Sequence, residues 1–380
     1  MSVLSARVDT VAELHGALAE FVGERVGADV SVSEPRRMAG GTGNETWAFD
    51  VLDPAGLVRD RLVLRRTVEQ GMLDGDPGTE FELLTALDRA GFPVPRPRWC
   101  VTEDSPLARP FIVVERLSGT DLRKHLARNA PAGRAPSSAR AGDTARNAPA
   151  ERVPGSAPAG DAVRNAPAER LPGSACAGDT AARPDVDRRR LGRRLVRLQA
   201  GLHRLVPVPG LDDSPPLDRW AEAIERATGD PGPLLATALD WLRATPPEPG
   251  HRCVVHGDFK TNNLVLGADD TLTVLDWELA HVGDPVEDLA WTMLWTTGFD
   301  LVGGLLGVDE YLAAYQAEAG RPVEPARLRY WRIFALVKLA AIFLTGVSRS
   351  TDPTPTLMGR AVHHIDAELG SLLPEALVAS

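Results

Sequence analysis

The stretch HGDFKTNNLVLGADDTLTVLD, residues 256–276, contains the pattern that decides how this chain folds. Two short apolar runs, Leu264–Leu266 and Leu272–Leu275, lie on either side of the turn sequence Gly-Ala-Asp-Asp. Apolar runs separated by Gly and Asp are typical of a β-hairpin. The stretch therefore predicts a hairpin that follows a polar loop, which begins His256-Gly257-Asp258.

The hairpin predicts that two polar side chains meet at its open end. If the turn is centred between Asp269 and Asp270, Asn263 lies opposite Asp276, and opposed Cα atoms are about 4.5 to 5.5 Å apart. An amide oxygen and a carboxylate at that spacing suit Mg²⁺, which completes its shell with phosphate oxygens and water. Asp258 lies five residues before Asn263. It is therefore free to accept a proton rather than bind the metal.

This pattern, H-G-D-x-x-x-x-N followed thirteen residues later by Asp, resembles the catalytic core of the aminoglycoside phosphotransferase and choline kinase-like family. The run Asp276-Trp277-Glu278 that follows is similar to that family as well. The resemblance implies a kinase-like fold and phosphoryl transfer. It further implies that Asp258 accepts the proton of a substrate hydroxyl, while Asn263 and Asp276 hold magnesium on the nucleotide phosphates.

Upstream of this core, residues alternate between apolar and polar, which predicts strands at Thr46–Leu52 and Leu62–Arg66. Asp76-Pro77-Gly78-Thr79 is a plausible helix start and Gly91 a plausible stop. Phe111–Glu115 indicates another buried strand. Downstream, helical patterns prevail. We therefore expect an α+β, bilobal, protein-kinase-like fold with a small β-rich N-lobe, residues 1–117, and a larger helical C-lobe, residues 118–380.

A glycine-rich segment, GGTGNET at residues 40–46, joins two predicted strands. Glycines there let backbone N–H groups approach phosphates closely, although an isolated segment of this kind can equally be an ordinary hairpin. The resemblance implies the nucleotide-covering loop. Many relatives have Ser where Gly43 stands, so the phosphate contacts would fall to backbone groups and to Thr42 or Asn44. The predicted nucleotide-binding residues here are Gly41, Thr42, Gly43 and Asn44.

Arg65 occupies the strand position at which kinases carry a lysine. Its guanidinium can bridge phosphate and carboxylate, but Arg and Lys are not interchangeable. On the following helix, Glu80 shares a face with Leu83, Leu84 and Leu87, and a carboxylate on an apolar stripe needs a partner. We expect an Arg65–Glu80 ion pair. The alternatives are a solvated strand charge for Arg65 and, for Glu80, a favourable interaction with the helix dipole.

The resemblance also identifies Glu115 to Leu117 as the hinge, whose backbone groups would contact the adenine. Glu115 and Leu117 are accordingly predicted nucleotide-binding residues. His203 matches a helix position of the family, but a packed or capping histidine is favoured there. Asp288 is expected to support the catalytic loop rather than take part in the chemistry. The tryptophans Trp277, Trp291 and Trp295 are expected in the core.

Between Ala127 and Thr180 the sequence repeats itself with a period of 18 residues. Each copy is rich in Ala, Pro, Gly and Arg and has almost no large apolar side chain to bury. Ordering it would cost backbone entropy with little return, whereas a solenoid must stack apolar faces. The repeats predict a disordered insert, at about residues 127–184, that interrupts the C-lobe.

The composition indicates which binding partners and which cellular compartment to expect. Lys and Arg number 42 against 52 acids, and a formal charge of −10 disfavours a nucleic-acid binder. The three cysteines are too scattered for a disulfide framework or a zinc cluster, which favours a cytoplasmic location. The N-terminus spaces Val11, Leu14, Leu18 and Phe21 along one helical face rather than forming a signal peptide. The apolar stretch Trp331–Val347 carries two charges, which indicates a buried helix rather than a membrane span.

The sequence thus predicts a phosphotransferase that uses ATP and Mg²⁺ and moves the γ-phosphoryl group to a hydroxyl of a small molecule. GTP is not excluded. An aminoglycoside-like antibiotic, a sugar or another alcohol are all compatible acceptors. A protein kinase is disfavoured because Trp277-Glu278 stands where kinases have Phe-Gly. The alternative from another class is a nucleotide-binding pseudo-kinase or scaffold module without turnover, which the replacement of Lys by Arg65 would support.

Overall fold

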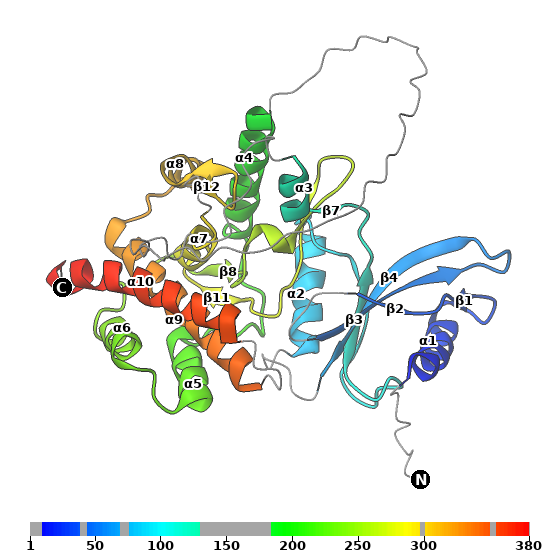
Figure 1. The fold of residues 1–380 in the computed structure, drawn as a ribbon. Coiled ribbons are helices and arrows are strands. Elements are labelled where there is room, and N and C mark those ends of the chain that lie inside the picture. Colours follow the sequence, from blue (N-terminus) through cyan, green and yellow to red (C-terminus); the bar gives the residue numbers. More distant parts are fainter. Residues whose placement is uncertain are drawn as a thin grey trace, which may run out of the picture.

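The computed structural model describes residues 10–38, 44–68, 76–129, 184–296, 301–349 and 355–379. Its N-terminal part is rich in strands and its C-terminal part is mostly helical (Figure 1). Helix α2, Pro77–Arg89, lies between the N-terminal sheet and the helical part. The expected α+β fold, with a β-rich N-terminal region and a helical C-terminal region, is confirmed.

The N-terminal region is built on one antiparallel sheet in the order β1-β3-β4-β6-β5, with β2 paired to β3. Its strands are β1 Ser31–Val32, β2 Arg36–Arg37, β3 Asn44–Leu52, β4 Val58–Thr67, β5 Pro97–Val101 and β6 Phe111–Glu115. The strands predicted from alternation are therefore all present, and β3 and β4 extend beyond the predicted bounds. Helix α1, Val11–Val26, begins at a capping box formed by Thr10 and Glu13.

The two helices of this region cover opposite faces of the sheet. Leu14, Leu18 and Phe21 of α1 share one core cluster with Leu62 and Leu64 of β4. The leucines of α2 share another cluster with alternate residues of β6, Ile112 and Val114. Because side chains point to opposite faces at every second position of a strand, the alternation in the sequence fixes which face each helix covers.

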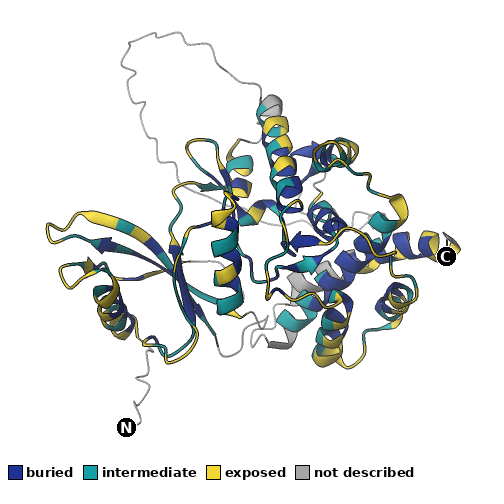
Figure 2. Ribbon diagram, turned by 180° about the vertical axis from the view of Figure 1, so that it is seen from behind, coloured by how far each residue is buried: buried dark blue, intermediate teal, exposed yellow. Residues whose placement is uncertain are grey.

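In the C-terminal region, helices α5, α6, α9 and α10 pack together, away from the N-terminal sheet (Figure 1). Helix α9 packs against α5, α7 and α10, and its central residues are buried (Figure 2). The predicted buried C-terminal helix is thus confirmed. The elements of this region are β7 Thr120–Asp121, α3 Leu122–Arg128, α4 Pro184–Leu202, α5 Pro216–Thr228, α6 Pro233–Ala244, β8 Cys253–Val255, the 3-10 turn η1 Thr261–Asn263, β9 Leu264–Leu266, β10 Leu272–Val274, β11 His281–Gly283, α7 Pro285–Met293, β12 Leu301–Val302, β13 Leu306–Gly307, α8 Val308–Ala319, α9 Pro325–Arg349 and α10 Pro355–Ala379.

The predicted hairpin exists, but its predicted register is wrong by one residue. Strands β9 and β10 pair Leu264 with Val274, and the N–H of Leu275 donates to the carbonyl of Asn263 at 2.8 Å. Asn263 therefore lies opposite Leu275 rather than Asp276. The cause is a three-residue turn that ends at Asp270, whose φ of 68° is left-handed, where the prediction assumed an even-numbered turn.

Several predicted features lie outside the described residues. These are the repeats from residue 130 to residue 183, which fall between α3 and α4, and the glycine-rich segment from residue 39 to residue 43. The predicted disorder of the repeats and the phosphate contacts of Gly41, Thr42 and Gly43 remain predictions. Within the part of the chain that is described, no helix combines the length and apolar character needed to cross a membrane.

Candidate active site

A cleft of about 1460 Å³ contains the predicted site residues Asn44, Arg65, Glu80, Asp258 and Asp276. Asn263, Glu115 and Leu117 line it as well. The cleft is formed by the inner face of the N-terminal sheet, the segment after β6, the polar loop before β9, and helices of the C-terminal region. The fold therefore brings together residues that are separated by more than 200 positions in the sequence.

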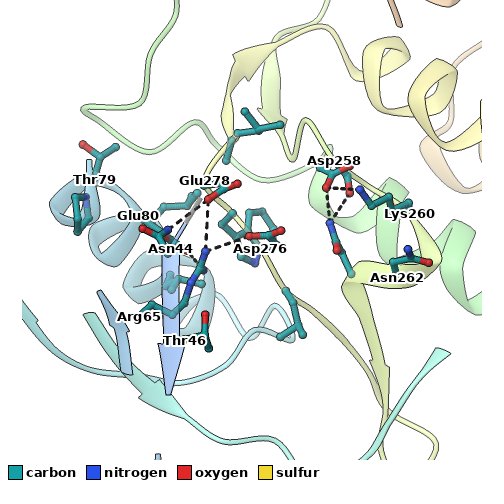
Figure 3. Close-up of a pocket in the computed structure, with 18 of the residues that line it drawn as sticks. Asn44, Thr46, Arg65, Thr79, Glu80, Asp258, Lys260, Asn262, Asp276 and Glu278 are labelled. Carbon is teal, nitrogen blue, oxygen red and sulfur yellow. Dashed lines mark hydrogen bonds and ion pairs between the residues drawn. The ribbon is translucent and has the colours of Figure 1, made fainter. Parts of the chain in front are cut away.

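The first cluster in the cleft is centred on the guanidinium of Arg65 (Figure 3). Arg65 forms an ion pair with Glu80 of α2, which confirms the predicted strand-to-helix pair. It also donates to Asp276 Oδ1 at 3.1 Å and lies 3.8 Å from Glu278 Oε2. Asn44 donates to the same Glu278 oxygen at 3.4 Å. Arg65 is thus not a solvated strand charge, because it connects three carboxylates.

This cluster holds more negative than positive charge. Burial by itself lowers the pKa of Arg65, but the attraction of Glu80, Asp276 and Glu278 outweighs it and raises the pKa of the guanidinium. Burial, together with the nearby charge of Asp276, raises the pKa of Glu278 to about 7. Three carboxylates around one guanidinium leave a site that favours an added cation.

The second cluster fixes the carboxylate of Asp258, whose side chain is 13% exposed. Asp258 Oδ1 accepts the indole N–H of Trp291 at 2.8 Å. Asp258 Oδ2 accepts the side-chain amide of Asn263 at 2.7 Å and lies 2.8 Å from Lys260 Nζ (Figure 3). Three donors from three positions therefore hold this carboxylate in one orientation, and Oδ1 keeps a lone pair for a further donor.

A buried carboxylate accepts hydrogen bonds from the backbone of the loop that carries Asp258. Asp288 of α7 is fully buried and accepts the backbone N–H groups of His256 and Gly257 at 2.8 and 2.9 Å. His203, which is 1% exposed, bonds to Asp288 and to Tyr315. The supporting position predicted for Asp288 and the packed histidine predicted at position 203 are both confirmed.

A buried lysine holds the same loop from helix α9. Lys338 is 1% exposed, donates to the carbonyl of Gly257 at 2.6 Å, and lies 3.1 Å from Glu287. Its ammonium also lies over the ring of Trp291, 4.9 Å from the centroid. Lys338 therefore contacts both the residue before Asp258 and the indole that bonds to Asp258.

Sequence reasoning assigned no role to Lys260, Glu278 or Lys338. The sequence did contain an indication for Lys338, because a lysine within an apolar helix is expected to be buried and to have a charged or polar partner. The prediction for the tryptophans was incomplete. Trp277 and Trp291 are each 2% exposed, as expected of core residues, but both line the cleft, as does Trp295. The indole N–H of Trp291 bonds to Asp258, a contact that no local pattern indicates.

The predicted metal residues, Asn263 and Asp276, both line the cleft and both carry side-chain oxygens. Among the described residues, no group of three or more His, Cys, Asp or Glu is arranged to hold a metal ion. Mg²⁺ needs only one or two protein carboxylates, with phosphate and water oxygens as the other ligands. Asp276, the side-chain oxygen of Asn263 and the surplus of negative charge fit that requirement. These residues therefore suit Mg²⁺ that is also bound by nucleotide phosphates, and not Mg²⁺ that is bound by protein ligands alone.

Comparison with curated sequences finds relatives in acyl-CoA dehydrogenase proteins. The chain is 30% identical over 156 residues, 34% of its length, to the Arabidopsis thaliana protein named Probable acyl-CoA dehydrogenase IBR3. It is also 30% identical over 143 residues to acyl-CoA dehydrogenase family member 10 of Mus musculus. These matches cover 19% and 13% of the two relatives, so the chain corresponds to less than a fifth of their length.

Solved structures with the same fold include proteins named as aminoglycoside phosphotransferases and choline kinases. A protein from Ralstonia eutropha assigned to the aminoglycoside phosphotransferases has a TM-score of 0.62 at 18% identity, covering 95% of this chain and 97% of its own. The choline kinase LicA from Streptococcus pneumoniae has a TM-score of 0.58 at 11% identity, covering 93% and 99%. A thermostable mutant of APH(4)-Ia in a ternary complex with ADP and hygromycin B has a TM-score of 0.53 at 13% identity, covering 94% and 98%. At these identities the likeness establishes the kinase-like fold alone.

A model of the phosphotransferase enzyme family matches residues 34–154 and 164–331 of the chain. The matched ranges include both clusters of the cleft, the one around Arg65 and the one around Asp258. This chain therefore belongs to the phosphotransferase enzyme family.

Proposed function

We propose that this protein transfers the γ-phosphoryl group of ATP to a hydroxyl group of a small molecule. The observation that carries the proposal is the carboxylate of Asp258, which three side chains orient inside the cleft that also contains the Arg65 cluster. In phosphoryl transfer the protein contributes mainly positioning and electrostatic stabilisation, and this cleft contains groups for both.

In the proposed reaction the acceptor oxygen attacks the γ-phosphorus, its proton passes to Asp258, and ADP is the leaving group. Arg65 would neutralise phosphate charge, since its guanidinium can bind oxygens of phosphate and carboxylate together. Asp276 and Asn263 would hold Mg²⁺, which supplies further neutralisation of the phosphates when bound. Backbone groups of Glu115 to Leu117 would receive the adenine. The AMP complex of LicA and the ADP complex of APH(4)-Ia support a nucleotide in this cleft.

The acceptor end of the cleft has an apolar wall. Helix α5 contributes Trp220 and Ala223, α9 contributes Ile342 and Phe343, and Trp295 completes the wall. Such a surface favours an acceptor with an apolar body, because removing apolar area from water is the main gain on binding there.

The charges at this end disfavour a polycation. Arg219 and Arg226 of α5 line it, and Lys260 pairs with Asp258. Among the described lining residues from α5, α7, α9, the catalytic loop and the segment Gly210–Asp212, the acidic side chains are Asp212 and Asp258. An aminoglycoside with several ammonium groups would need more carboxylates than these. We therefore infer a neutral or anionic alcohol with an apolar body as the acceptor.

A test combines the purified protein, MgCl₂ and ATP or GTP with a panel of aminoglycosides, choline, sugars and alkyl alcohols with and without a carboxylate. The expected result is release of nucleoside diphosphate and a matching gain of one phosphate in the mass of an apolar alcohol. Phosphorylation of aminoglycosides alone would contradict the inferred acceptor. Nucleotide binding without acceptor-dependent diphosphate release, unchanged in Asp258→Asn, would favour the pseudo-kinase alternative.

A further inference from the structure

A second hollow, of about 400 Å³, lies where the first part of β4, the start of β5 and the end of β6 meet, and five arginines line it. Arg59 and Arg61 come from the first part of β4, Arg96 and Arg98 from the start of β5 and the residue before it, and Arg116 from the segment after β6. We call this feature the arginine hollow. Asp60 and Glu115 are the acidic residues among its described lining residues, so positive charge prevails there in a chain of formal charge −10.

The nearby acids do not satisfy these arginines. Arg98 forms an ion pair with Asp60, which also lies 3.8 Å from Arg59, and Arg116 donates to Asp50. Within the described part of the chain, the side chains of Arg61 and Arg96 make no ion pair or hydrogen bond. Arg61 and Arg96 are both exposed, so water solvates these two guanidinium groups and leaves them accessible to an anion.

Arg116 adds a second indication of a missing partner. Its Nη2 atom donates to Asp50, but its Nη1 atom is buried and has no hydrogen-bond partner among the described residues. A buried donor without an acceptor is destabilising, and more so when the group is charged. Because this atom is buried, an anion in the arginine hollow would reach it only after the side chain of Arg116 rotates toward the hollow.

The backbone under the arginine hollow is fixed, which keeps the arginines together. The N–H of Arg116 donates to the carbonyl of Arg61, and the N–H of Glu115 donates to the carbonyl of Arg96, both at 2.8 Å. These bonds connect β4, the start of β5 and the segment after β6. Repulsion between neighbouring guanidinium groups therefore cannot be relieved by moving one strand away from another.

The positions of these arginines favour one class of anion. The arginines line one hollow from three backbone segments, so an occupant that contacts all three segments must present acceptor oxygens in several directions. A tetrahedral phosphate does so, while a planar carboxylate presents two oxygens in one plane, and Arg binds phosphate with two parallel hydrogen bonds. We propose that the arginine hollow, which adjoins the cleft and shares Glu115 and Arg116 with it, is a binding site for a small phosphate-bearing anion.

The location of the site can be tested because Arg61 and Arg96 do not line the cleft. Inorganic pyrophosphate is titrated into the full-length protein in a calorimeter without divalent cations, using the parent and Arg61→Gln/Arg96→Gln. We expect the variant to bind pyrophosphate at least about tenfold more weakly, because it loses charge-assisted hydrogen bonds from two guanidinium groups to the anion.

The matched control is Arg36→Gln/Arg37→Gln, which removes two exposed arginines from β2 of the same sheet. It changes the net charge equally, so retained pyrophosphate affinity in this control shows that the hollow, not overall charge, is responsible. Affinity for ATP measured on the same variants shows whether the cleft is intact. Equal pyrophosphate affinity of the parent and Arg61→Gln/Arg96→Gln would overturn the proposal, and so would tighter binding of citrate than of pyrophosphate by the parent.

Discussion

Asp258 and Asp276 lie in one cleft but have different surroundings. We therefore expect substitution of Asp258 to lower turnover and substitution of Asp276 to lower nucleotide affinity. Asp258→Asn keeps the shape of a side chain that bonds to Trp291, Asn263 and Lys260 and removes its ability to take a proton. Turnover should fall by about 10² to 10⁴, the usual contribution of general-base catalysis. Nucleotide affinity should change little. Steady-state kinetics together with nucleotide titration measures both.

The control for this variant is Asp240→Asn on α6, where the side chain is 80% exposed. It removes the same charge far from the cleft and should leave both quantities unchanged. A turnover number for Asp258→Asn close to that of the parent would refute the assignment of the base.

Asp276→Asn should instead remove the magnesium-dependent part of nucleotide affinity. Asp276 has a φ of 66°, and Asn adopts this left-handed conformation more readily than Ala, so the variant tests the charge rather than the backbone. Calorimetric titration with ATP in the presence and absence of Mg²⁺ separates the two parts. Asp270→Asn is a matched control, because Asp270 has a φ of 68° in the hairpin turn outside the cleft. If Mg²⁺ increases the affinity of Asp276→Asn as it does that of the parent, another group holds the metal.

At the scale of elements, strand β11 and helices α7 and α9 meet at a buried group of charges. His281 lies 3.0 Å from Glu287, which in turn lies 3.1 Å from Lys338. Burial alone lowers the pKa of His281, but its ion pair with Glu287 outweighs this and raises the pKa above its ordinary value. Burial alone raises the pKa of Glu287, and the charges of His281 and Lys338 outweigh it and lower that pKa.

This arrangement predicts how stability depends on pH. Because the folded state raises the pKa of His281, its contribution is full below about pH 6.5, the ordinary pKa, and is lost as the pH rises through the folded-state pKa. Urea denaturation of the parent and of His281→Asn at a series of pH values measures that contribution. The difference in free energy of unfolding should shrink as the pH rises above about 6.5. A difference that grows with pH would contradict the ion pair.

Two glycines of helix α4 should respond in opposite ways to replacement by alanine. A Cβ atom at Gly192 would lie 2.9 Å from Cδ2 of Leu306, which is 1% exposed and cannot move aside, whereas at Gly201 the nearest atom is 3.9 Å away. Gly201→Ala should stabilise the protein by about 0.5 to 1 kcal/mol through helix propensity. Gly192→Ala should destabilise it by about 1 to 3 kcal/mol through overpacking. Thermal denaturation of both variants measures the signs, and two stabilising effects would show that β13 does not pack closely on α4.

For the whole molecule, we expect the 18-residue repeats to contribute little to stability. Their sequence has little apolar surface to bury, and loop-closure entropy grows only as about (3/2)RT ln n. Removing residues 130–183, between the described helices α3 and α4, should change the free energy of unfolding by roughly 1 kcal/mol or less. Denaturation of the deletion variant beside the parent is the measurement. A variant that melts well below the parent would show that the repeats pack on the rest of the protein.

The sequence alone determined the elements and the chemical types of the site residues. Alternation along β3 and β4 predicted these strands, because side chains point to opposite faces at every second position, and the apolar run of β6 predicted a buried strand. The spacing on α2 placed Glu80 with the leucines and so predicted its pair with Arg65. The order of His, Asp, Asn and Asp in residues 256–276 identified the family, since this pattern comes from one contiguous stretch.

Tertiary structure alone decided the contacts between residues far apart in the chain. The bond from Trp291 to Asp258 and the bond from Lys338 to Gly257 each join helices to a distant loop, and no local periodicity encodes them. The hairpin register also escaped prediction, because one left-handed residue, Asp270, shifts all later pairings by one. Periodicity reports which face of an element is buried, whereas the partner on that face depends on how the elements pack.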